Sequence, residues 1–355
     1  MFYEFLPSQA NYISKNEIWS LFVFIIIFTA CDYGRMELKM VNIIIPAYNA
    51  HKTIRQTLAS VAVQDNQDNI KLTIIDDCSD EPYDYLLNDY KYLNINIFKT
   101  PFNSGPGQAR QYGIDHTDCE YLIFLDADDC FYSCDSVKKL LTTIKDGNYD
   151  VVSSIFLEET VNNNEYLPHK NDIVWMHGKI YRTQYIKERN IRFNEARTQE
   201  DSAFNTIILY TDANIYFTEY ATYIWKNNKN SITRSSDYFS DSMDEFILNT
   251  EYTLTELIRL NVKKSNLCTC VLQYLISFYG YYLMFLKRKK NRIFLNNYIL
   301  NLKRFYKNIP VELTEVITEE QLEQIFYKHV LINTIFFQNI IMTISIFDFI
   351  EMLKE

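Results

Sequence analysis

The sequence predicts an α/β fold: a Rossmann-like, mainly parallel sheet flanked by helices, followed by a helical C-terminal region. Three observations support this prediction. Short apolar runs alternate with amphipathic segments from Met40 to about residue 156, several of these runs end in proline or acidic residues, and apolar residues recur at helical spacing beyond about residue 240. Strands separated by helices of about 10–15 residues are typical of βαβ units.

Five apolar segments are predicted to be strands, at residues 41–46, 71–76, 94–98, 121–125 and 150–156. The first ends at Pro46, which cannot donate to a sheet ladder, and the third alternates with a period of two. Apolar spacing predicts helices over residues 54–62, 107–116 and 136–145. Ligands of open parallel sheets bind beyond the carboxyl ends of the strands, so we expect the site at residues 46–49, 76–77 and 126–129.

The C-terminal third is predicted to be helical, with segments at residues 243–260, 267–286 and 330–347. The last two are nearly continuous apolar runs, which leaves a membrane helix as an alternative, especially for 267–286 with the cations that follow it. Buried helices of a packed bundle are favoured, because amides such as Gln273 are costly in lipid. This region also offers a surface for oligomerisation.

Composition limits the partners of the chain. Its 45 acidic residues outnumber 35 basic ones, for a net charge of -10, so a nucleic-acid partner is not expected. The basic cluster Lys287–Arg292 is the exception, and it indicates either a solvated helix end or a contact with an anionic membrane surface. The seven cysteines form no C-x-x-C pair, which favours reduced thiols and a cytoplasmic location, with association at the cytoplasmic face of the membrane as an option.

The first 39 residues stand apart from this pattern. Residues 18–31 are apolar but shorter than a membrane span of about 20 residues. We consider an N-terminal appendage or a mis-assigned start, a membrane anchor and a cleaved signal peptide. The predicted organisation is residues 1–39 as appendage or hydrophobic segment, 40–240 as α/β domain and 241–355 as helical domain.

Glycine is scarce, with 7 residues where average usage of about 7% predicts roughly 25. Three of the seven fall within residues 105–113, and a fourth is Gly178. A chain that avoids glycine elsewhere retains it where the backbone must approach another group closely. We therefore expect a close backbone approach in the segment 105–113.

Three polar motifs point to chemistry. Asp126 and Asp128 follow a predicted strand, and clustered carboxylates favour a divalent cation such as Mg²⁺ or Mn²⁺, although an Asp-rich turn also fits. Arg110 lies in the first turn of a predicted helix after two glycines, an arrangement that suits a phosphate. Glu200 and Asp201 precede an apolar helical stretch, where they fit either a general base or helix N-terminal charge.

Taken in order and spacing, six segments resemble family 2 glycosyltransferases, which have the GT-A fold. The segments are Ile-Pro-Ala-Tyr-Asn (45–49), Ile-Asp-Asp-Cys-Ser-Asp (75–80), Asn103 to Ile114, Phe-Leu-Asp-Ala-Asp-Asp (124–129), Met-His-Gly-Lys-Ile-Tyr-Arg (176–182) and Gln-Glu-Asp (199–201). Asn-Ser-Ile-Thr-Arg-Ser (230–235) resembles a segment near the end of their catalytic domain. The match covers roughly residues 40–236.

The resemblance implies a role for each matching residue. A nucleotide-sugar donor would be bound by Pro46, Ala47, Tyr48, Asp77, Arg110, Asp126 and Lys179, with Asp77 at the base, expected to be uracil. Asp128 and Asp126 would hold Mn²⁺ or Mg²⁺ on the diphosphate. Asp201 would deprotonate the acceptor hydroxyl with Glu200 beside it, and His177 would border the acceptor. One departure is Ala50-His51-Lys52, where relatives often have an acidic residue after the asparagine.

The activity implied is inverting transfer from a nucleotide-diphosphate sugar to a hydroxyl of a glycan or lipid-linked acceptor. No Q-x-x-R-W motif follows Asp201, which favours transfer of a single sugar. Three alternatives remain: a phage-type glycosyltransferase acting on hydroxymethylated DNA bases, a nucleotidyltransferase on a similar fold, and a non-catalytic nucleotide-sugar binding protein.

Overall fold

The computed structural model describes residues 40–161, 165–228, 242–287, 292–314 and 346–354. These residues belong to a compact unit, Met40–Glu355. The predictions for residues 1–39, for most of the predicted helix 330–347, for residues 288–291 of the basic cluster and for the segment 230–235 lie outside the described residues.

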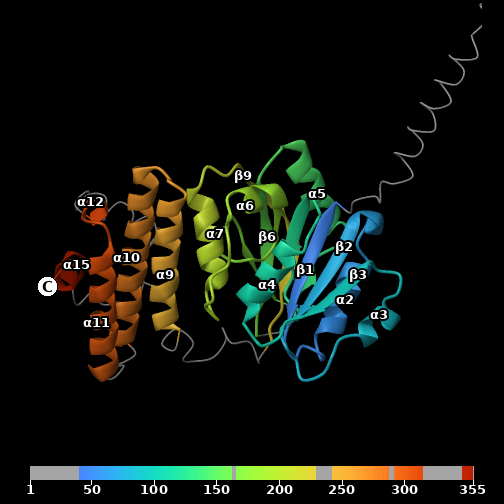
Figure 1. Ribbon diagram of the computed structural model, residues 1–355, viewed down its shortest axis with the longest axis horizontal. Helices are drawn as coiled ribbons and strands as arrows, with labels where there is room; N and C mark the ends of the chain where they lie inside the picture. Colours follow the sequence, from blue (N-terminus) through green and yellow to red (C-terminus); the bar gives the residue numbers. More distant parts are fainter. Residues whose placement is uncertain (1–39, 162–164, 229–241, 288–291, 315–345, 355) are drawn as a thin grey trace, which may run out of the picture. The chain divides into compact units, whose positions relative to one another are not determined.

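Within the described residues, nine strands form one sheet in the order β3-β2-β1-β4-β8-β6-β9-β5, and β7 pairs with β6 (Figure 1). Their bounds are β1 Val41–Ala47, β2 Ile70–Asp76, β3 Ile95–Lys99, β4 Tyr121–Phe124, β5 Cys130–Phe131, β6 Val151–Glu159, β7 Tyr166–His169, β8 Lys179–Arg182 and β9 Ile215–Trp225. All five predicted strands are present, and β5, β7, β8 and β9 are additional.

The sheet is parallel over its first four strands, where β1 pairs in parallel with both β2 and β4, and β2 with β3. Beyond β4 it is mixed: β8 is antiparallel to β4 and β6, whereas β9 is parallel to β6. The predicted α/β sheet flanked by helices is therefore confirmed, and it is less uniformly parallel than the sequence indicates. The carboxyl ends of β1, β2 and β4 lie at the same edge of the sheet, as predicted, because these strands are parallel.

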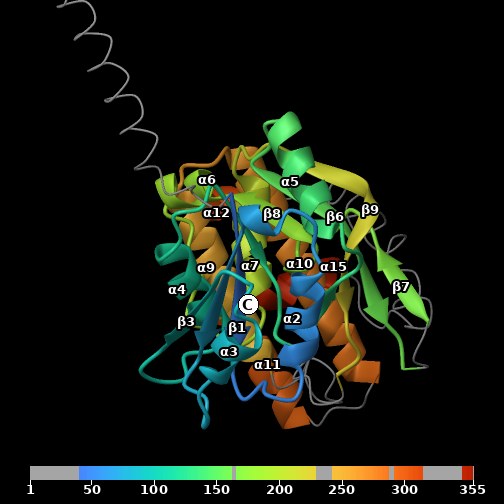
Figure 2. The same ribbon diagram turned by 90° about the vertical axis from the view of Figure 1, so that its right-hand side faces the viewer.

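Alternation along the strands divides the core between the two faces of the sheet. Ile43 and Ile45 of β1 pack on one face with α2 (Ile54–Ala62) and α5 (Ser136–Asp146), whereas Ile44 packs on the other with α4 (Pro106–Asp115). Figure 2 shows α2 and α5 on one side of β1 and α4 on the other. Successive side chains of a strand point to opposite faces, so this continuous apolar run requires helices on both sides.

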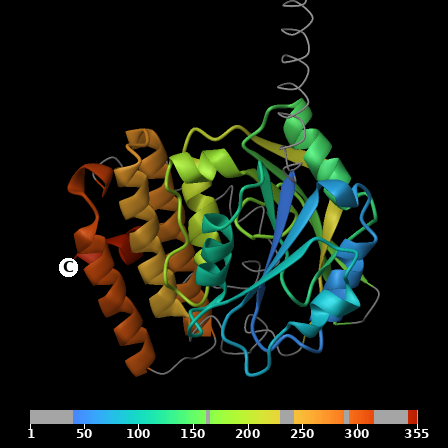
Figure 3. The same ribbon diagram turned by 45° about the vertical axis from the view of Figure 1, so that its right-hand side comes forward.

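The C-terminal helices are α9 Met243–Arg259, α10 Lys264–Lys287, α11 Arg292–Asn308, α12 Val311–Thr314 and α15 Ile346–Lys354. Figures 1 and 3 show α9, α10 and α11 side by side, with α7 (Glu200–Tyr210) between them and the sheet. Buried Phe246, Thr250, Leu254 and Leu257 recur at helical spacing along α9, which contacts α7, α10 and α11. The two predicted helices 243–260 and 267–286 are thus present.

By length and composition, α10 alone among the described helices is apolar enough to cross a membrane. The stretch is Lys264–Leu286. Its most apolar 18 residues have a mean hydropathy of 1.3, and 67% of them are buried within the structure. Such burial is typical of a core helix, as predicted for this segment from its internal amides. The short helices α3 (Tyr85–Asp89) and α6 (Thr183–Glu188) complete the described elements beside a 3₁₀ turn at Gln67–Asn69.

Candidate active site

One cavity of about 1040 Å³ lies at the carboxyl ends of β1, β2 and β4. Residues from all six sequence motifs line it, as do residues of α9 and α10. Among the described residues, its charged lining consists of six carboxylates and three Lys/Arg side chains: Asp77, Asp126, Asp128, Asp129, Glu200 and Asp201 against Lys52, Arg110 and Arg197. A concave pocket with converging ionisable groups is the expected form of an active site.

Pro46, Ala47 and Tyr48 line one end of the cavity at the carboxyl end of β1, where the Tyr48 side chain is exposed. Asp77 lies beside them and is buried. Its carboxylate accepts hydrogen bonds from the backbone amides of Ser104 at 3.0 Å and Gly105 at 2.7 Å. Asp77 therefore stabilises the loop that precedes α4. Its contact with the base stays a prediction.

Arg110 forms the centre of the site. Its guanidinium donates to Asp126 Oδ1 and to Glu200 Oε1, both at 2.6 Å, and the side chain is buried. Burial opposes the charge of Arg110, but Asp126 and Glu200 outweigh that effect and raise its pKa. The predicted phosphate contact of Arg110 would thus be shared with two carboxylates from distant segments.

A glycine permits this arrangement. A Cβ placed on Gly107, in the first turn of α4, would lie 2.5 Å from Cγ of Glu200. Real Cβ atoms do not come this close to another carbon, so only glycine lets α4 approach the start of α7. The close approach predicted for the segment 105–113 is present at this position.

The acid loop, Asp126–Asp129, combines three carboxylates in different environments. Burial favours a higher pKa for Asp126, but Arg110 and His177 lower it below the usual value. Burial raises the pKa of Asp128, whose carboxylate accepts from Asn228 Nδ2 at 2.8 Å. Burial, Asp128 and Asp126 raise the pKa of Asp129 well above its usual value.

Asp129 is held by the end of β9. Its carboxylate accepts from the Tyr223 hydroxyl at 2.6 Å and from the backbone amide of Lys226 at 2.8 Å. Asp129 was not among the predicted site residues. Its signal was its place as the third acid of the Asp-Ala-Asp-Asp motif.

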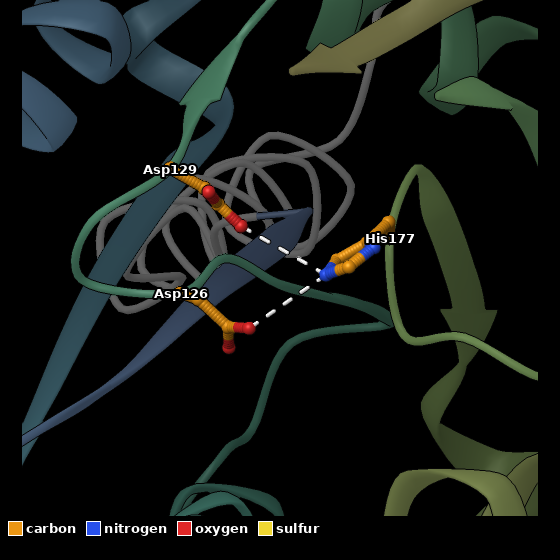
Figure 4. Close-up of side chains that lie close together, drawn as sticks. All are labelled: Asp126, Asp129 and His177. Carbon is orange, nitrogen blue, oxygen red and sulfur yellow. Dashed lines mark ion pairs between the residues drawn. The ribbon is translucent and has the colours of Figure 1, made fainter. Parts of the chain in front are cut away.

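His177 faces the acid loop (Figure 4). Its Nε2 lies 3.8 Å from carboxylate oxygens of both Asp126 and Asp129. Its Nδ1 is buried and has no hydrogen-bond partner among the described residues. The ring stacks near Tyr223 with centroids 4.8 Å apart, so neighbouring rings fix its orientation.

The donor atoms present here fit a divalent cation. Ligand atoms of Asp126, Asp129 and His177 lie within 4.8 Å of one another. Burial and neighbouring negative charge raise the pKa of both Asp128 and Asp129. A bound cation would reduce the repulsion between these crowded carboxylates. Oxygen-rich sets of this kind suit Mg²⁺ or Mn²⁺.

Lys179 lies apart from the cavity. Its fully buried ammonium donates to the backbone carbonyls of Trp175 at 2.5 Å and His177 at 3.4 Å, and to Asp172 at 3.3 Å. Burial lowers its pKa, and Asp172 opposes that effect. Lys179 thus supports the loop that carries His177, whereas the resemblance implied a contact with the donor.

Glu200 and Asp201 begin α7, and both line the cavity. Gln199 precedes them with φ 59°, a left-handed conformation that is uncommon outside glycine and often found at functional sites. Burial and the neighbouring Asp201 raise the pKa of Glu200, and burial also raises the pKa of Asp201 against the opposing effect of Arg110. A buried carboxylate with a raised pKa is suited to accept a proton.

Two tryptophans complete the wall near His177, and no motif pointed to them. Trp175 and Trp225 line the cavity with ring centroids 5.3 Å apart. The sequence offered one indication of these residues, namely that tryptophan is rare in this chain, which has only three. Asn228 and Arg197, which also line the cavity, carried no signal in the sequence.

Comparison with known proteins shows which family the sequence of this chain matches. The family model described as "Glycosyl transferase family 2" matches residues 42–207. Poly(ribitol-phosphate) beta-N-acetylglucosaminyltransferase TarS of Staphylococcus aureus is 28% identical over 189 residues, which cover 49% of this chain. The match spans only about a third of that relative, 33% of its length.

Two further comparisons extend the match. A processive diacylglycerol beta-glycosyltransferase of Mycoplasma genitalium is 24% identical over 233 residues, covering 56% of this chain and 67% of that protein. The crystal structure of S. aureus TarS residues 1–349 with UDP-GlcNAc superposes with a TM-score of 0.67 and 20% identity, covering 82% of this chain and 87% of that one. The fold is therefore of the GT-A type, with a helical C-terminal region, as predicted.

Proposed function

Since residues 42–207 belong to glycosyl transferase family 2, we propose that this chain transfers a single sugar from a UDP-sugar to a hydroxyl of a glycan or lipid-linked acceptor, with inversion at the anomeric carbon. The observation that carries the proposal is the meeting of the acid loop, Arg110 and the Glu200-Asp201 pair in one cavity.

The donor would lie with its nucleoside against Pro46, Ala47 and Tyr48 and its diphosphate toward the acid loop. Asp77 beside this end supports the predicted uracil contact, and UDP-GlcNAc is our first choice of donor because TarS has been crystallised with it. Arg110 would neutralise negative charge from its position between Asp126 and Glu200.

A divalent cation would be held by carboxylates of Asp126 and Asp128, with Asp129 and His177 as further candidate ligands. When bound, Mn²⁺ or Mg²⁺ supplies Lewis-acid stabilisation of the charge that develops on the departing diphosphate. Asn228 keeps Asp128 oriented through its amide at 2.8 Å.

Asp201 would act as the general base. The acceptor oxygen forms a bond to the anomeric carbon while the bond from that carbon to the diphosphate oxygen breaks. The acceptor proton passes to Asp201, and the electron pair leaves with the diphosphate. Burial, which raises the pKa of Asp201, matches the base to this transfer. Glu200, fixed on Arg110, positions the start of α7.

Organisation and location complete the proposal. Residues 40–240 would form the catalytic domain, residues 241–355 a helical domain able to mediate oligomerisation, and residues 1–39 an appendage or hydrophobic segment. The six cysteines in the described part of the chain are free thiols, in keeping with a cytoplasmic protein. Contact with the cytoplasmic membrane surface through Lys287–Arg292 remains part of the proposal.

Incubation of the full chain with UDP-, GDP- and TDP-sugars and Mn²⁺ tests it, with released nucleotide as the readout. We expect release from a UDP-sugar, and greater release when glycosides are added. Release of pyrophosphate from a nucleoside triphosphate and a sugar phosphate would instead identify a nucleotidyltransferase. Transfer to hydroxymethylated DNA but to no glycoside would identify the DNA-modifying alternative.

A further inference from the structure

The cavity extends past the catalytic carboxylates into the C-terminal helices. Its wall there comes from α10, with Gln273, Ser277 and Tyr281 spaced four residues apart, and from Phe246 of α9. Residues four apart lie on the same face of a helix, so these α10 side chains form one stripe that faces the cavity. We name Gln273, Ser277 and Tyr281 the α10 stripe.

The α10 stripe explains why polar residues interrupt an otherwise apolar helix. Most of α10 is buried, and Gln273, Ser277 and Tyr281 are only partly buried because they border the cavity. The Gln273 side-chain oxygen accepts from the Tyr210 hydroxyl at 2.6 Å, so the amide is held in place. Phe246 packs edge-on against Tyr281, with centroids 5.6 Å apart.

Among the described side chains of α9 and α10, none that lines the cavity is charged. The rest of its lining has six carboxylates against three Lys/Arg residues, and one of the three, Arg110, is already paired with two carboxylates. Among the residues that the structure describes, an anionic group placed here would meet net negative charge without a dedicated cation. Aromatic rings, an amide and a hydroxyl instead suit a neutral polar ring with apolar faces.

We propose that the α10 stripe, with Phe246, is the acceptor subsite, and that it binds an uncharged sugar residue. This inference rests on the proposed function, whose donor would contact other lining residues of the same cavity, Pro46, Ala47 and Tyr48. A volume of about 1040 Å³ is at the upper limit of pockets for one drug-sized ligand, about 300–1,000 Å³, which leaves room for donor and acceptor sugars together. The sugar is either the end of a free glycan or the headgroup of a glycolipid.

Saturation-transfer NMR on the full chain loaded with UDP and Mn²⁺ tests the proposal without requiring turnover. The probes are methyl and octyl β-glycosides of glucose, galactose and N-acetylglucosamine, with ribitol 5-phosphate as the anionic comparison. We expect at least one glycoside to bind at least tenfold more tightly than ribitol 5-phosphate. Similar affinities of the methyl and octyl forms identify a free glycan, whereas a tenfold preference for octyl identifies a glycolipid.

Ser277→Phe should fill the subsite and weaken glycoside binding at least tenfold, with less than a twofold change in UDP affinity by calorimetry. Ser265→Phe, the same change at an exposed position of α10 outside the cavity, is the matched control and should behave as wild type. If Ser277→Phe does not fold, Gln273→Glu replaces it, because a carboxylate still accepts from Tyr210 while its charge and lost donor weaken sugar binding.

Tighter binding of ribitol 5-phosphate, no glycoside binding, or equal glycoside affinity in Ser277→Phe would overturn the subsite. A wild-type chain that fails to bind UDP would overturn the proposed function instead, so the two failures are distinguishable.

Discussion

Arg110 and Glu200 form an ion pair of 2.6 Å in which each side chain is only 5% exposed. The same guanidinium reaches Asp126 at 2.6 Å, so one arginine joins the proposed metal-binding loop to the proposed base helix. Breaking a buried pair costs more than an exposed pair contributes, because the remaining charge is left without a partner. Stability and activity therefore both depend on Arg110.

We expect Arg110→Met to lower the free energy of unfolding by about 3–5 kcal/mol, the usual cost of unpairing a buried charge. Urea denaturation measures this change. Arg192→Met is the control: its partner Asp115 is exposed, and such pairs contribute about 0–1 kcal/mol. In a double-mutant cycle with Glu200→Gln, an interaction energy near zero would show that the pair is not energetically coupled.

Asp201→Asn should reduce transfer at least 100-fold, since general bases contribute about 10²–10⁴-fold. UDP affinity should stay within a few fold of wild type, because Asp201 is expected to act on the acceptor proton. Steady-state kinetics and calorimetry provide the two readouts. A wild-type rate in Asp201→Asn would remove it as the base, and a loss confined to Glu200→Gln would transfer that role to Glu200.

The pH profile should report the base directly. Asp201 must be deprotonated to accept a proton, so kcat rises as the pH rises through its pKa. Burial raises that pKa, which places the acidic limb above the usual aspartate value of about 3.9. Rates from pH 4 to 9 with Mn²⁺ check this expectation. A limb centred at or below the ordinary value would contradict the assignment.

Mn²⁺ should raise the melting temperature of the protein, because a ligand that binds only the folded state stabilises it by mass action. Asp128→Asn should lose most of this shift, since the carboxylate charge is removed while the partner Asn228 remains. Asp212→Asn, an exposed carboxylate outside the cavity, should retain it. Equal shifts in Asp128→Asn and wild type would exclude Asp128 as a ligand.

Lys179→Met should destabilise the loop that carries His177. The change removes the ammonium donor from Asp172 and from two backbone carbonyls, and a buried acceptor left without any donor costs about 1–3 kcal/mol. We expect a lower urea midpoint and a weaker activity, with UDP affinity less affected. Lys138→Met, on the exposed side of α5, should change neither. A large loss of UDP affinity alone would favour the donor contact that the resemblance implies.

The sequence predicted the sheet where apolar runs were long and uniform, as in Ile43–Ile45, because such runs require burial on both faces. It did not reveal β8, a four-residue strand that begins with the fully buried Lys179. Lysine is rarely buried, and here its burial depends on acceptors brought by tertiary contacts. The ion pairs of Arg110 with two carboxylates could not be predicted for the same reason, because both partners lie in other segments of the sequence.

The anchoring of Asp129 to β9 has a consequence for synthesis. Tyr223 and Lys226 follow Asp129 by 94 and 97 residues, so at about 5–20 residues per second the acid loop waits about 5–20 s on the ribosome for its partners. A fragment ending at residue 207, where the family match ends, would contain the acid loop, Arg110 and the Glu200-Asp201 pair. It would still lack the strand that holds Asp129, so sequence coverage overstates how much of the site such a fragment could assemble.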